Sequence, residues 1–219
     1  MEDFTEWHKR WNEGQTGWHN EQPNEYLCTN FKPLFFKDHP NILIPLCGKS
    51  QDLIWLAKQG ATVIGVELVE KAIQDFFSQW GMPPTRTTTD GIARYSFGSI
   101  TIFCADFFSV TRQHTGVIDA VYDRAALVAL PPHKRQQYIE HELSFLASGH
   151  PLLLISYEMP RSETTGPPFS IKADTVPELY KAAGSVTLLE QHLRSADKDE
   201  QLVKRSLPWA STSIWQITK

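Results

Sequence analysis

The sequence predicts an α/β protein built on a mostly parallel β-sheet with helices on both faces. Short apolar runs that are typical of buried strands alternate along the chain with segments of helical periodicity. This alternation is the pattern of units in which parallel strands are joined by helices. The 219 residues, 41% hydrophobic and 21% charged, are enough for one large domain with a buried core. We therefore expect a single domain over residues 1–219, with residues 1–40 as an N-terminal helical extension.

The N-terminal extension is expected to hold two short helices joined by a polar loop. Residues 2–14 have amphipathic helical periodicity, and residues 25–36 predict a second helix. The apolar side chains of the first helix share one face: Phe4, Trp7 and Trp11. Between the two helices, "NEGQTGWHNEQPN" is rich in turn formers and predicts a loop.

The next segment predicts two strands, each followed by a helix. The strands are "NILIPL" (41–46) and "TVIGVEL" (62–68). The first helix is expected at 50–60, with Ser50 as its N-cap and Gly60 just past its end. The second is expected at 70–81, with one apolar face formed by Ile73, Phe76, Phe77 and Trp80.

The rest of the chain continues the alternation. Residues 93–108 predict a hairpin that turns near Gly98, and residues 116–124 predict a strand. The remaining expected elements are a helix (131–149), a strand (151–159), a long loop (160–175), a helix (176–184) and two strands (185–193, 211–219). Because no long helix separates the last two strands, we expect at least one of them to be antiparallel.

Composition and motifs exclude several classes of function. A net charge of −4 and the lack of a basic stripe argue against nucleic-acid binding, and "HKRQQ" (133–137) is expected to be a solvated helix start. No apolar run approaches the ~18 residues that span a bilayer, and the N-terminus lacks a secretory signal. Three cysteines without a C-x-x-C pair, and histidines without ligand spacing, indicate neither disulfides nor a metal site. We therefore expect a cytoplasmic protein without metal.

Gly48 and Glu67 predict a nucleotide-type site at the ends of the first two strands. Gly48 lets the backbone approach a ligand, and the following helix N-terminus favours an anionic group. Glu67, 19 residues later, can accept hydrogen bonds from both hydroxyls of a ribose. The turn lacks the G-x-G-x-x-G that a pyrophosphate requires, which favours a ligand without phosphates such as S-adenosylmethionine. A purely structural turn with a solvated Glu67 is an equally good interpretation of the spacing alone.

Two further strand ends carry polar residues. Asp106 and Phe107 follow the third strand, where they could accept from an adenine amino group and pack on its ring. An acid in a loop beside core aromatics is the alternative. Asp123 and Arg124 end the fourth strand. We interpret Asp123 as a member of a structural ion pair, and Arg124 as a fork suited to a carboxylate or a heteroaromatic acceptor.

Together these pieces resemble the thiopurine S-methyltransferase family of class I S-adenosylmethionine-dependent methyltransferases, including its bacterial members. The matching stretches are "WHKRWNEGQTGWHNEQPN", "PLCGKSQDLIWLAKQGATVIGVELVEKAIQDFF", "YDRAALVALPPHKRQQY" and "LLLISYEMPRSETTGPPFSI". They occur in the family's order over most of the chain. The resemblance implies a Rossmann-like, doubly wound, seven-stranded sheet, mostly parallel with its last strand antiparallel, and an N-terminal helical cover.

The resemblance also implies a set of cofactor contacts. It assigns Trp11, Leu46, Glu67 and Arg124 to S-adenosylmethionine, with Leu46 acting through its backbone. It places Asp106 and Phe107 at the adenine, and Gly48 lies in the same turn. Trp7 and Trp18 belong to the covering segment, and for Trp7 we favour a role in the core.

Methyl transfer to a soft nucleophile would need positioning more than acid–base catalysis. The protein must place a sulfur roughly 3 Å from the methyl carbon and exclude water. Arg124 is the candidate to orient the acceptor or to stabilise its thiolate. Phe169 in the long loop could line the acceptor pocket, and a proline-stiffened loop with one core aromatic is an equally good interpretation. The expected acceptors are aromatic or heterocyclic thiols such as thiopurines, with selenium or tellurium species as further candidates. We expect a monomer.

Three alternatives stay open at this stage. One is a methyltransferase that acts on another small nucleophile, and another is an NAD-dependent oxidoreductase, which the glycine-poor turn disfavours. The third is a nucleotide-binding module without catalysis.

Overall fold

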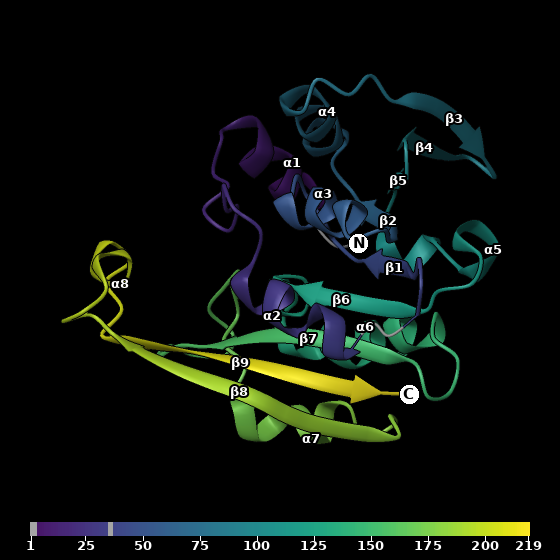
Figure 1. Cartoon of the computed structure of the whole chain (residues 1–219). Helices are drawn as coiled ribbons and strands as arrows, with labels where there is room; N and C mark the ends of the chain where they lie inside the picture. The colour runs from purple at the N-terminus through teal and green to yellow at the C-terminus, as the bar shows by residue number, and fades with distance from the viewer. Residues whose placement is uncertain (1–3, 35–36) are drawn as a thin grey trace. The chain divides into compact units, whose positions relative to one another are not determined.

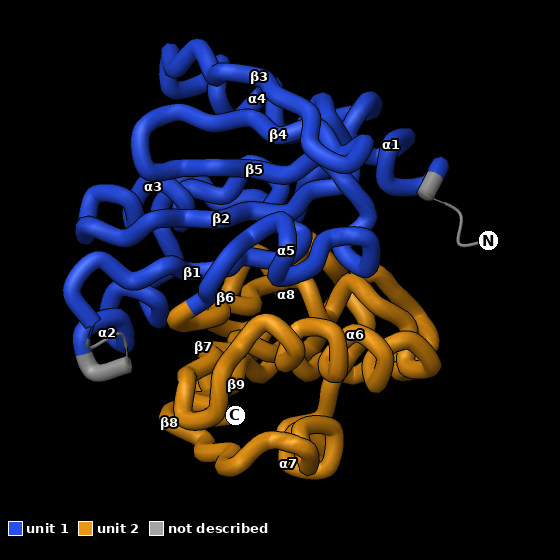
Figure 2. The backbone as a smooth tube through the Cα atoms, turned by 90° about the vertical axis from the view of Figure 1, so that its right-hand side faces the viewer, with its two compact units in different colours: residues 1–118 blue, residues 119–219 orange. Residues whose placement is uncertain are grey.

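The computed structural model describes residues 4–34 and 37–219. The chain forms two compact units, Met1–Ile118 and Asp119–Lys219 (Figure 2). The single domain expected from the sequence stays a prediction. Among the described residues, no helix has both the length and the apolar character that crossing a bilayer requires.

The N-terminal extension contains two helices, as predicted. Helix α1 covers Phe4–Asn12 and α2 covers Glu25–Leu34. The predicted helices began at residue 2 and ended at residue 36, and residues 1–3 and 35–36 lie outside the described part, as does the side chain of Phe4. The buried carboxylate of Asp52 accepts a hydrogen bond from the backbone N–H of Asn24 at 2.7 Å. This bond fixes the start of α2 to the first turn of α3.

The first unit is built on five strands in the order β3-β4-β5-β2-β1 (Figure 1). β1 (Asn41–Ile44) and β5 (Ile100–Cys104) each pair in parallel with the central strand β2 (Thr62–Glu67). β2 is an almost continuous buried apolar run, which is typical of a strand covered on both faces. The hairpin predicted near Gly98 is confirmed, because β4 (Ile92–Phe97) pairs antiparallel with β5.

Helices α3 and α4 connect the parallel strands and pack against β2 and β5. α3 covers Gln51–Lys58, and its predicted cap is confirmed because Ser50 Oγ accepts from the N–H of Asp52 at 3.2 Å. α4 covers Glu70–Gln79 and buries the predicted apolar face, with one exception. Trp80 lies beyond the last helical residue, is 40% exposed and is covered by the ammonium of Lys58. The prediction that Trp80 shares the apolar face of this helix is therefore wrong.

The predicted number of strands is also wrong. The described residues contain nine strands, five in the first unit and four in the second, rather than seven. The strands beyond the predicted seven are β4, expected as part of the hairpin, and β3 (Thr85–Thr89), which was missed. β3 is an edge strand whose residues are all exposed, so it has no apolar alternation. The Asp90-Gly91 turn, at φ 50° and 80°, was the available hairpin signal.

The second unit has four strands in the order β6-β7-β9-β8. β6 (Ala120–Arg124) and β7 (Pro151–Glu158) are parallel. β9 (Trp209–Thr218) runs antiparallel to both β7 and β8 (Ser185–Ser195), which confirms the antiparallel last strand. In each unit, all strands but one point the same way, as expected for a mostly parallel sheet.

The helices predicted at 131–149 and 176–184 in the second unit are both shorter than predicted. α6 covers Pro132–Ser144, whereas α7 (Val176–Leu179) is a single turn. The remaining short elements of the chain are α5 (Arg112–Thr115), α8 (Glu200–Lys204) and three 3₁₀ turns at Phe107–Ser109, Leu127–Ala129 and Ala173–Thr175. Arg135 in α6 is only 4% exposed, so the expectation of a solvated basic helix start is wrong at that position.

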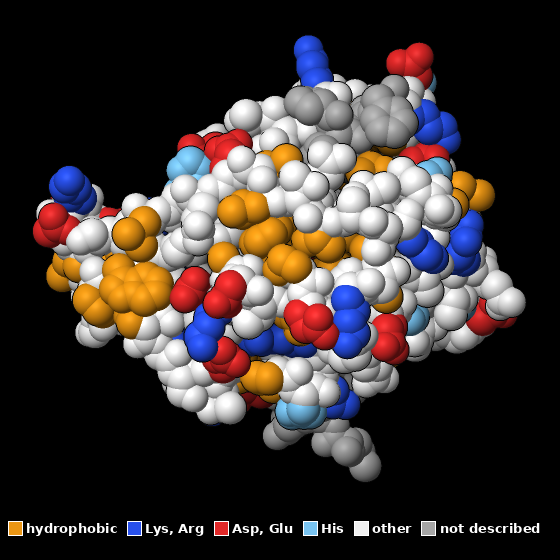
Figure 3. Space-filling model, turned by 90° about the horizontal axis from the view of Figure 1, so that it is seen from below, with side chains coloured by type: hydrophobic (Ala, Val, Ile, Leu, Met, Phe, Trp, Pro, Cys, Tyr) orange, Lys and Arg blue, Asp and Glu red, His pale blue; other side chains and the backbone are white. Residues whose placement is uncertain are grey.

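Exposed apolar side chains interrupt an otherwise polar surface. In the second unit they include Leu188, Leu193 and Val203. Figure 3 shows hydrophobic side chains gathered near the middle of one face and at its left end, beside a band of acidic and basic groups. Such mixed patches are ordinary for a globular surface.

Candidate functional site

The turn after β1 has a strained backbone. Leu46 has φ 47° and Gly48 has φ 54°, both in the left-handed region. This conformation costs a non-glycine residue roughly 1–2 kcal/mol and occurs mainly at ligand sites and turns. The turn is attached to β2, because the N–H of Cys47 donates to the carbonyl of Val66 at 3.0 Å. Gly65 permits this approach, since a Cβ there would lie 2.7 Å from the sulfur of Cys47.

Glu67, at the end of β2, is bonded to this turn. Its Oε2 accepts from the N–H of Gly48 and its Oε1 accepts from the N–H of Val69, both at 2.8 Å. The residue is 7% exposed. Each carboxylate oxygen can accept a second hydrogen bond. Glu67 is thus a buried, oriented carboxylate with acceptor capacity left for two hydroxyl groups, and the alternative of a solvated strand end is wrong.

Burial raises the pKa of Glu67 above its ordinary value. The opposing influences are weaker: the hydrogen bonds from Val69 and Gly48, and then the nearby His8, favour the charged form and lower the pKa. Additional hydroxyl donors would act in the same direction as these amides. A ligand that donates to Glu67 would therefore bind its ionised form best.

Trp11 of α1 covers the turn. A Cβ placed on Gly48 would lie 3.2 Å from Cζ2 of Trp11, so the indole rests directly over this glycine. Trp11 is 4% exposed and packs with Val69 and Ala72 at the start of α4. Trp7 and Trp18 border this cluster, and Trp18 meets both other tryptophans edge-on. The location of Trp7 agrees with the preferred core role.

Asp106 and Phe107 follow β5 beside the end of β2. The N–H of Ala105 donates to the carbonyl of Glu67 at 3.0 Å, which brings this segment next to the carboxylate. Asp106 caps the 3₁₀ turn by accepting from the N–H of Phe108 at 3.2 Å, and Phe107 is 4% exposed. Asp106 thus has a structural role that does not exclude a ligand, because its other carboxylate oxygen can also accept.

Arg124 ends β6 in the second unit, and the following residue, Ala125, has φ 66°. The predicted ion pair of Asp123 is wrong. Asp123 is fully buried, and the partners found for it are the N–H groups of Ala126 and Leu127 and the hydroxyl of Tyr138. Directly after Arg124, the carboxylate therefore shapes the turn through backbone hydrogen bonds.

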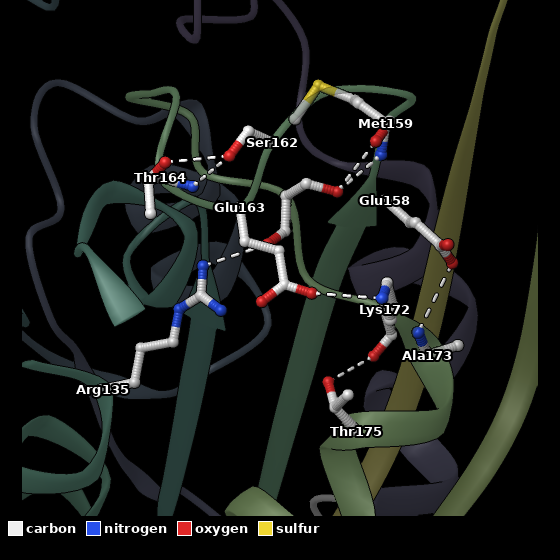
Figure 4. A network of polar contacts seen from close by, with 10 residues as sticks. Arg135, Glu158, Met159, Ser162, Glu163, Thr164, Lys172, Ala173 and Thr175 are labelled. Atoms are coloured by element: carbon white, nitrogen blue, oxygen red, sulfur yellow. Dashed lines mark hydrogen bonds and ion pairs between the residues drawn. The ribbon is translucent and has the colours of Figure 1, made fainter. Parts of the chain in front are cut away.

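The long loop after β7 is closed at its base (Figure 4). Arg135 donates to the carbonyl of Ser170 at 3.0 Å. The hydroxyl of Ser170 accepts from the N–H of Met159 at 2.9 Å and donates to its carbonyl at 3.0 Å. Phe169 is half-buried, and its N–H donates to the carbonyl of Val128 at 2.7 Å. The loop that carries Phe169 is thus tied to the segment that follows Arg124.

Comparison with known proteins decides the family. The sequence profile "Thiopurine S-methyltransferase" matches residues 2–219. The chain belongs to the thiopurine S-methyltransferase family. Among the similar relatives is a Thiopurine S-methyltransferase of Pseudomonas aeruginosa, 40% identical over 97% of this chain and 97% of that protein. Another, from Pseudomonas paraeruginosa, is 37% identical over the same shares.

Solved structures show the fold but less about the reaction. A Burkholderia thailandensis 1,6-didemethyltoxoflavin-N1-methyltransferase, with bound 1,6-didemethyltoxoflavin and S-adenosylhomocysteine, has a TM-score of 0.64 at 12% identity. The similarity covers 98% of this chain and 86% of that one. The cyclase SpnF has a TM-score of 0.61 at 12% identity over 88% of this chain and 79% of its own. Because this fold hosts more than one reaction, membership of the thiopurine S-methyltransferase family, and not the fold, supplies the argument for methyl transfer.

Some residues that bond to these segments, or that lie buried beside them in α6, were not found from the sequence. The N–H of Val69 leaves no side-chain signal. Arg135 and Glu142 did leave one: positions 135, 138, 139, 142 and 143 follow the spacing of a buried helix face. An arginine and a glutamate at such positions must find polar partners inside the protein, which could have marked them.

Proposed function

We propose that this chain transfers the methyl group of S-adenosylmethionine to the sulfur of an aromatic or heterocyclic thiol, such as a thiopurine. Membership of the thiopurine S-methyltransferase family supports this activity. The structural observation that carries the proposal is the buried carboxylate of Glu67, which is bonded to Gly48 and Val69 beneath Trp11. The cofactor supplies an electrophilic methyl group on a positively charged sulfur.

The residues of the first unit fit this cofactor. Glu67 would accept from the two ribose hydroxyls with its remaining lone pairs. Leu46 and Gly48 would offer backbone atoms at close range, since their strained turn already has the required conformation. Trp11 would shield the site from water and stabilise the positive sulfur by cation–π attraction, worth about 0.5–2 kcal/mol. Asp106 and Phe107 would hold the adenine.

The charge near the turn disfavours a dinucleotide. Asp52 lies in the first turn of α3 with 2% of its surface exposed, so it adds negative charge to the helix end that would receive a phosphate. A pyrophosphate would bring two further negative charges to this end. S-adenosylmethionine carries a single carboxylate, accompanied by an amino group. The charge at this helix end therefore favours S-adenosylmethionine over a dinucleotide, as does the lack of a G-x-G-x-x-G motif in the turn.

Arg124 is proposed to orient the acceptor and to stabilise its thiolate. An aromatic thiol ionises readily near neutral pH, so the reaction needs a cationic partner for the sulfur more than it needs a general base. A guanidinium stays protonated under all working conditions. Phe169 would provide an apolar wall for the aromatic ring of the acceptor.

The test is a titration followed by an acceptor panel. Calorimetry should detect S-adenosylmethionine binding to the purified chain and no binding of NAD. Methyl-labelled cofactor should then transfer its label to aromatic thiols faster than to aliphatic thiols. Selenite and tellurite belong in the same panel, because selenium and tellurium nucleophiles have the same geometric requirement. Binding of NAD in place of S-adenosylmethionine would overturn the proposal.

The expected partner is a small molecule, and we propose a monomer located in the cytoplasm that binds neither nucleic acid nor metal. Size-exclusion chromatography with light scattering tests the monomer. A dimer would contradict only the proposed monomer, because the assignment of residues to the cofactor does not depend on the oligomeric state.

A further inference from the structure

Four titratable side chains meet at fully buried positions inside the second unit. They are Asp123 at the end of β6, Tyr138 and Glu142 on α6, and Tyr180 directly after α7. Each has no exposed surface. The proposed reaction uses none of them, and buried carboxyl groups are costly unless they are hydrogen-bonded and paired or neutral.

Asp123 has the hydrogen bonds of an ionised carboxylate. The backbone N–H groups of Ala126 and Leu127 donate to it at 3.2 Å, and the hydroxyl of Tyr138 donates at 2.9 Å. All of these partners are donors, and a carboxylate accepts from them on both oxygens. Such bonds favour the charged form of Asp123.

Glu142 has the surroundings of a protonated carboxyl group. The hydroxyl of Tyr180 donates to its Oε2 at 3.0 Å, and the hydroxyl of Tyr138 lies 3.4 Å from its Oε1. Because that hydroxyl has one proton and lies closer to Asp123, at 2.9 Å, the shorter bond leaves Oε1 of Glu142 the weaker donor contact. The hydroxyl of Tyr138 therefore lies within hydrogen-bond distance of both carboxyl groups, which brings the two acids together at one buried point. Among the described residues, no lysine, arginine or histidine forms an ion pair with either group.

The electrostatics agree with this assignment. Burial is the largest cause that raises the pKa of Glu142 well above its ordinary value, and the charge of Asp123 is the next. Burial also raises the pKa of Asp123, against the opposing hydrogen bonds from Tyr138, Leu127 and Ala126. Like charges in contact without a cation disfavour double ionisation.

Asp123 is bonded to the turn that follows Arg124. Asp123 immediately precedes Arg124, and its bonds to Ala126 and Leu127 fix the left-handed Ala125 between them. The same segment continues to Val128, whose carbonyl accepts from the N–H of Phe169 at 2.7 Å. A change at the pair would therefore be transmitted through backbone hydrogen bonds to both residues proposed to contact the acceptor.

We propose that Asp123 and Glu142 share one proton, and that the singly protonated pair positions Arg124 and Phe169 for the methyl acceptor. This role rests on the proposed function, whereas the shared proton does not. Glu142, Tyr138 and Tyr180 are positioning residues, since they act through Asp123. At alkaline pH, loss of the proton leaves two carboxylates beside the same Tyr138 hydroxyl at fully buried positions. The turn then opens, and methyl transfer falls about tenfold per pH unit, as for any step that needs one bound proton.

The test uses Glu142→Gln as a permanently neutral mimic. Its amide N–H can donate to Asp123 while its oxygen accepts from Tyr180, so the bonds of the protonated acid are retained. We expect the alkaline fall in kcat/KM for the acceptor to disappear, with cofactor affinity unchanged. An aromatic thiol that is fully ionised over the whole pH range removes the titration of the acceptor. Glu140→Gln is the matched control: it lies on the same helix, is exposed and should behave as the parent.

Proton binding provides a readout that does not depend on activity. Because the pKa of Glu142 is higher in the folded than in the unfolded chain, folding takes up a proton at pH values between the two, and stability falls there as pH rises. Glu142→Gln should remove about one proton from this uptake, and Glu140→Gln should not. In the unmodified chain at pH 8, infrared spectroscopy should show the C=O band of a buried carboxylic acid, and this measurement requires no variant to fold.

The outcomes separate the two claims. A missing acid band, or an unchanged proton uptake in Glu142→Gln, overturns the shared proton. An unchanged alkaline limb in an active Glu142→Gln variant overturns the positioning role. If the proton readouts are as expected but no thiol is methylated by the parent, the proposed function fails and the shared proton stands.

Discussion

Replacing Glu67 with glutamine should lower both the stability of the fold and the affinity of the cofactor site. The carboxylate accepts two backbone N–H bonds at 2.8 Å, from Gly48 and Val69. A glutamine oxygen can keep one of these bonds, but its NH₂ group then faces the other amide, which loses its partner. A buried, unsatisfied amide costs about 1–3 kcal/mol. Removing a buried charge offsets part of this, so we expect a loss of about 1–2 kcal/mol in the free energy of unfolding.

The effect on S-adenosylmethionine adds to this. The variant loses an acceptor for one ribose hydroxyl, and hydrogen bonds to a charged group contribute about 1.5–3 kcal/mol each. The dissociation constant should therefore rise about 10- to 100-fold. Calorimetric titration measures the affinity, and urea unfolding verifies that the variant is folded. Glu21→Gln, at an exposed position, is the control for loss of charge. A folded Glu67→Gln variant that binds within twofold of the parent would refute this account of the site.

Four further predictions follow from the same geometry. In Gly48→Ala the new residue must adopt φ 54° and its Cβ lies 3.2 Å from Trp11, so the free energy of unfolding and the cofactor affinity should both fall. Gly91→Ala is the control, because it has the backbone strain of φ 80° but no neighbour within 4 Å of its Cβ. Equal losses of stability in the two variants would argue against crowding by Trp11. Arg124→Ala should lower kcat at least about tenfold while the cofactor dissociation constant changes much less, and parallel losses in the transfer assay and the titration would contradict its role at the acceptor. Gly166→Ala places a Cβ 2.5 Å from Cγ of Phe169, so the Phe169 ring must move. The KM for the acceptor should then rise while the cofactor affinity stays constant. An unchanged KM would exclude Phe169 from the acceptor pocket. Burial raises the pKa of Glu67, and ribose hydroxyls favour its ionised form. Cofactor affinity should therefore decline up to tenfold per pH unit as the pH falls through that pKa. The decline should be absent in Glu67→Gln titrated over the same pH range.

Many parts of the fold followed from local pattern, because apolar periodicity and helix caps act over a few residues. The strands that flank Gly48 and Glu67, the Ser50 cap and the hairpin at Gly98 were all predictable in this way. The misses have local causes too. β3 has no buried face to give it a period, and Trp80 keeps the helical spacing although α4 ends before it.

The cofactor site was predictable in part. The pairing of Gly48 with Glu67 could be inferred from spacing, because strand ends and turns carry ligands in parallel sheets. The hydrogen bond from the N–H of Gly48 to the carboxylate of Glu67 could not be inferred from spacing, and neither could the position of Trp11 over Gly48. Both depend on contacts between segments that are 19 or more residues apart, and the sequence leaves the choice among such contacts open.

The sequence by itself determined the alternation of strands and helices, the glycine-poor turn and the resemblance that led to the family. These follow from side-chain chemistry and short-range periodicity. Only the tertiary structure decided that Glu67 is a buried acceptor, that Asp123 shapes a turn instead of forming an ion pair, and that Glu142 meets it in the core. Burial and long-range hydrogen bonds set the charge state of a carboxyl group, and neither can be computed from neighbours in the chain.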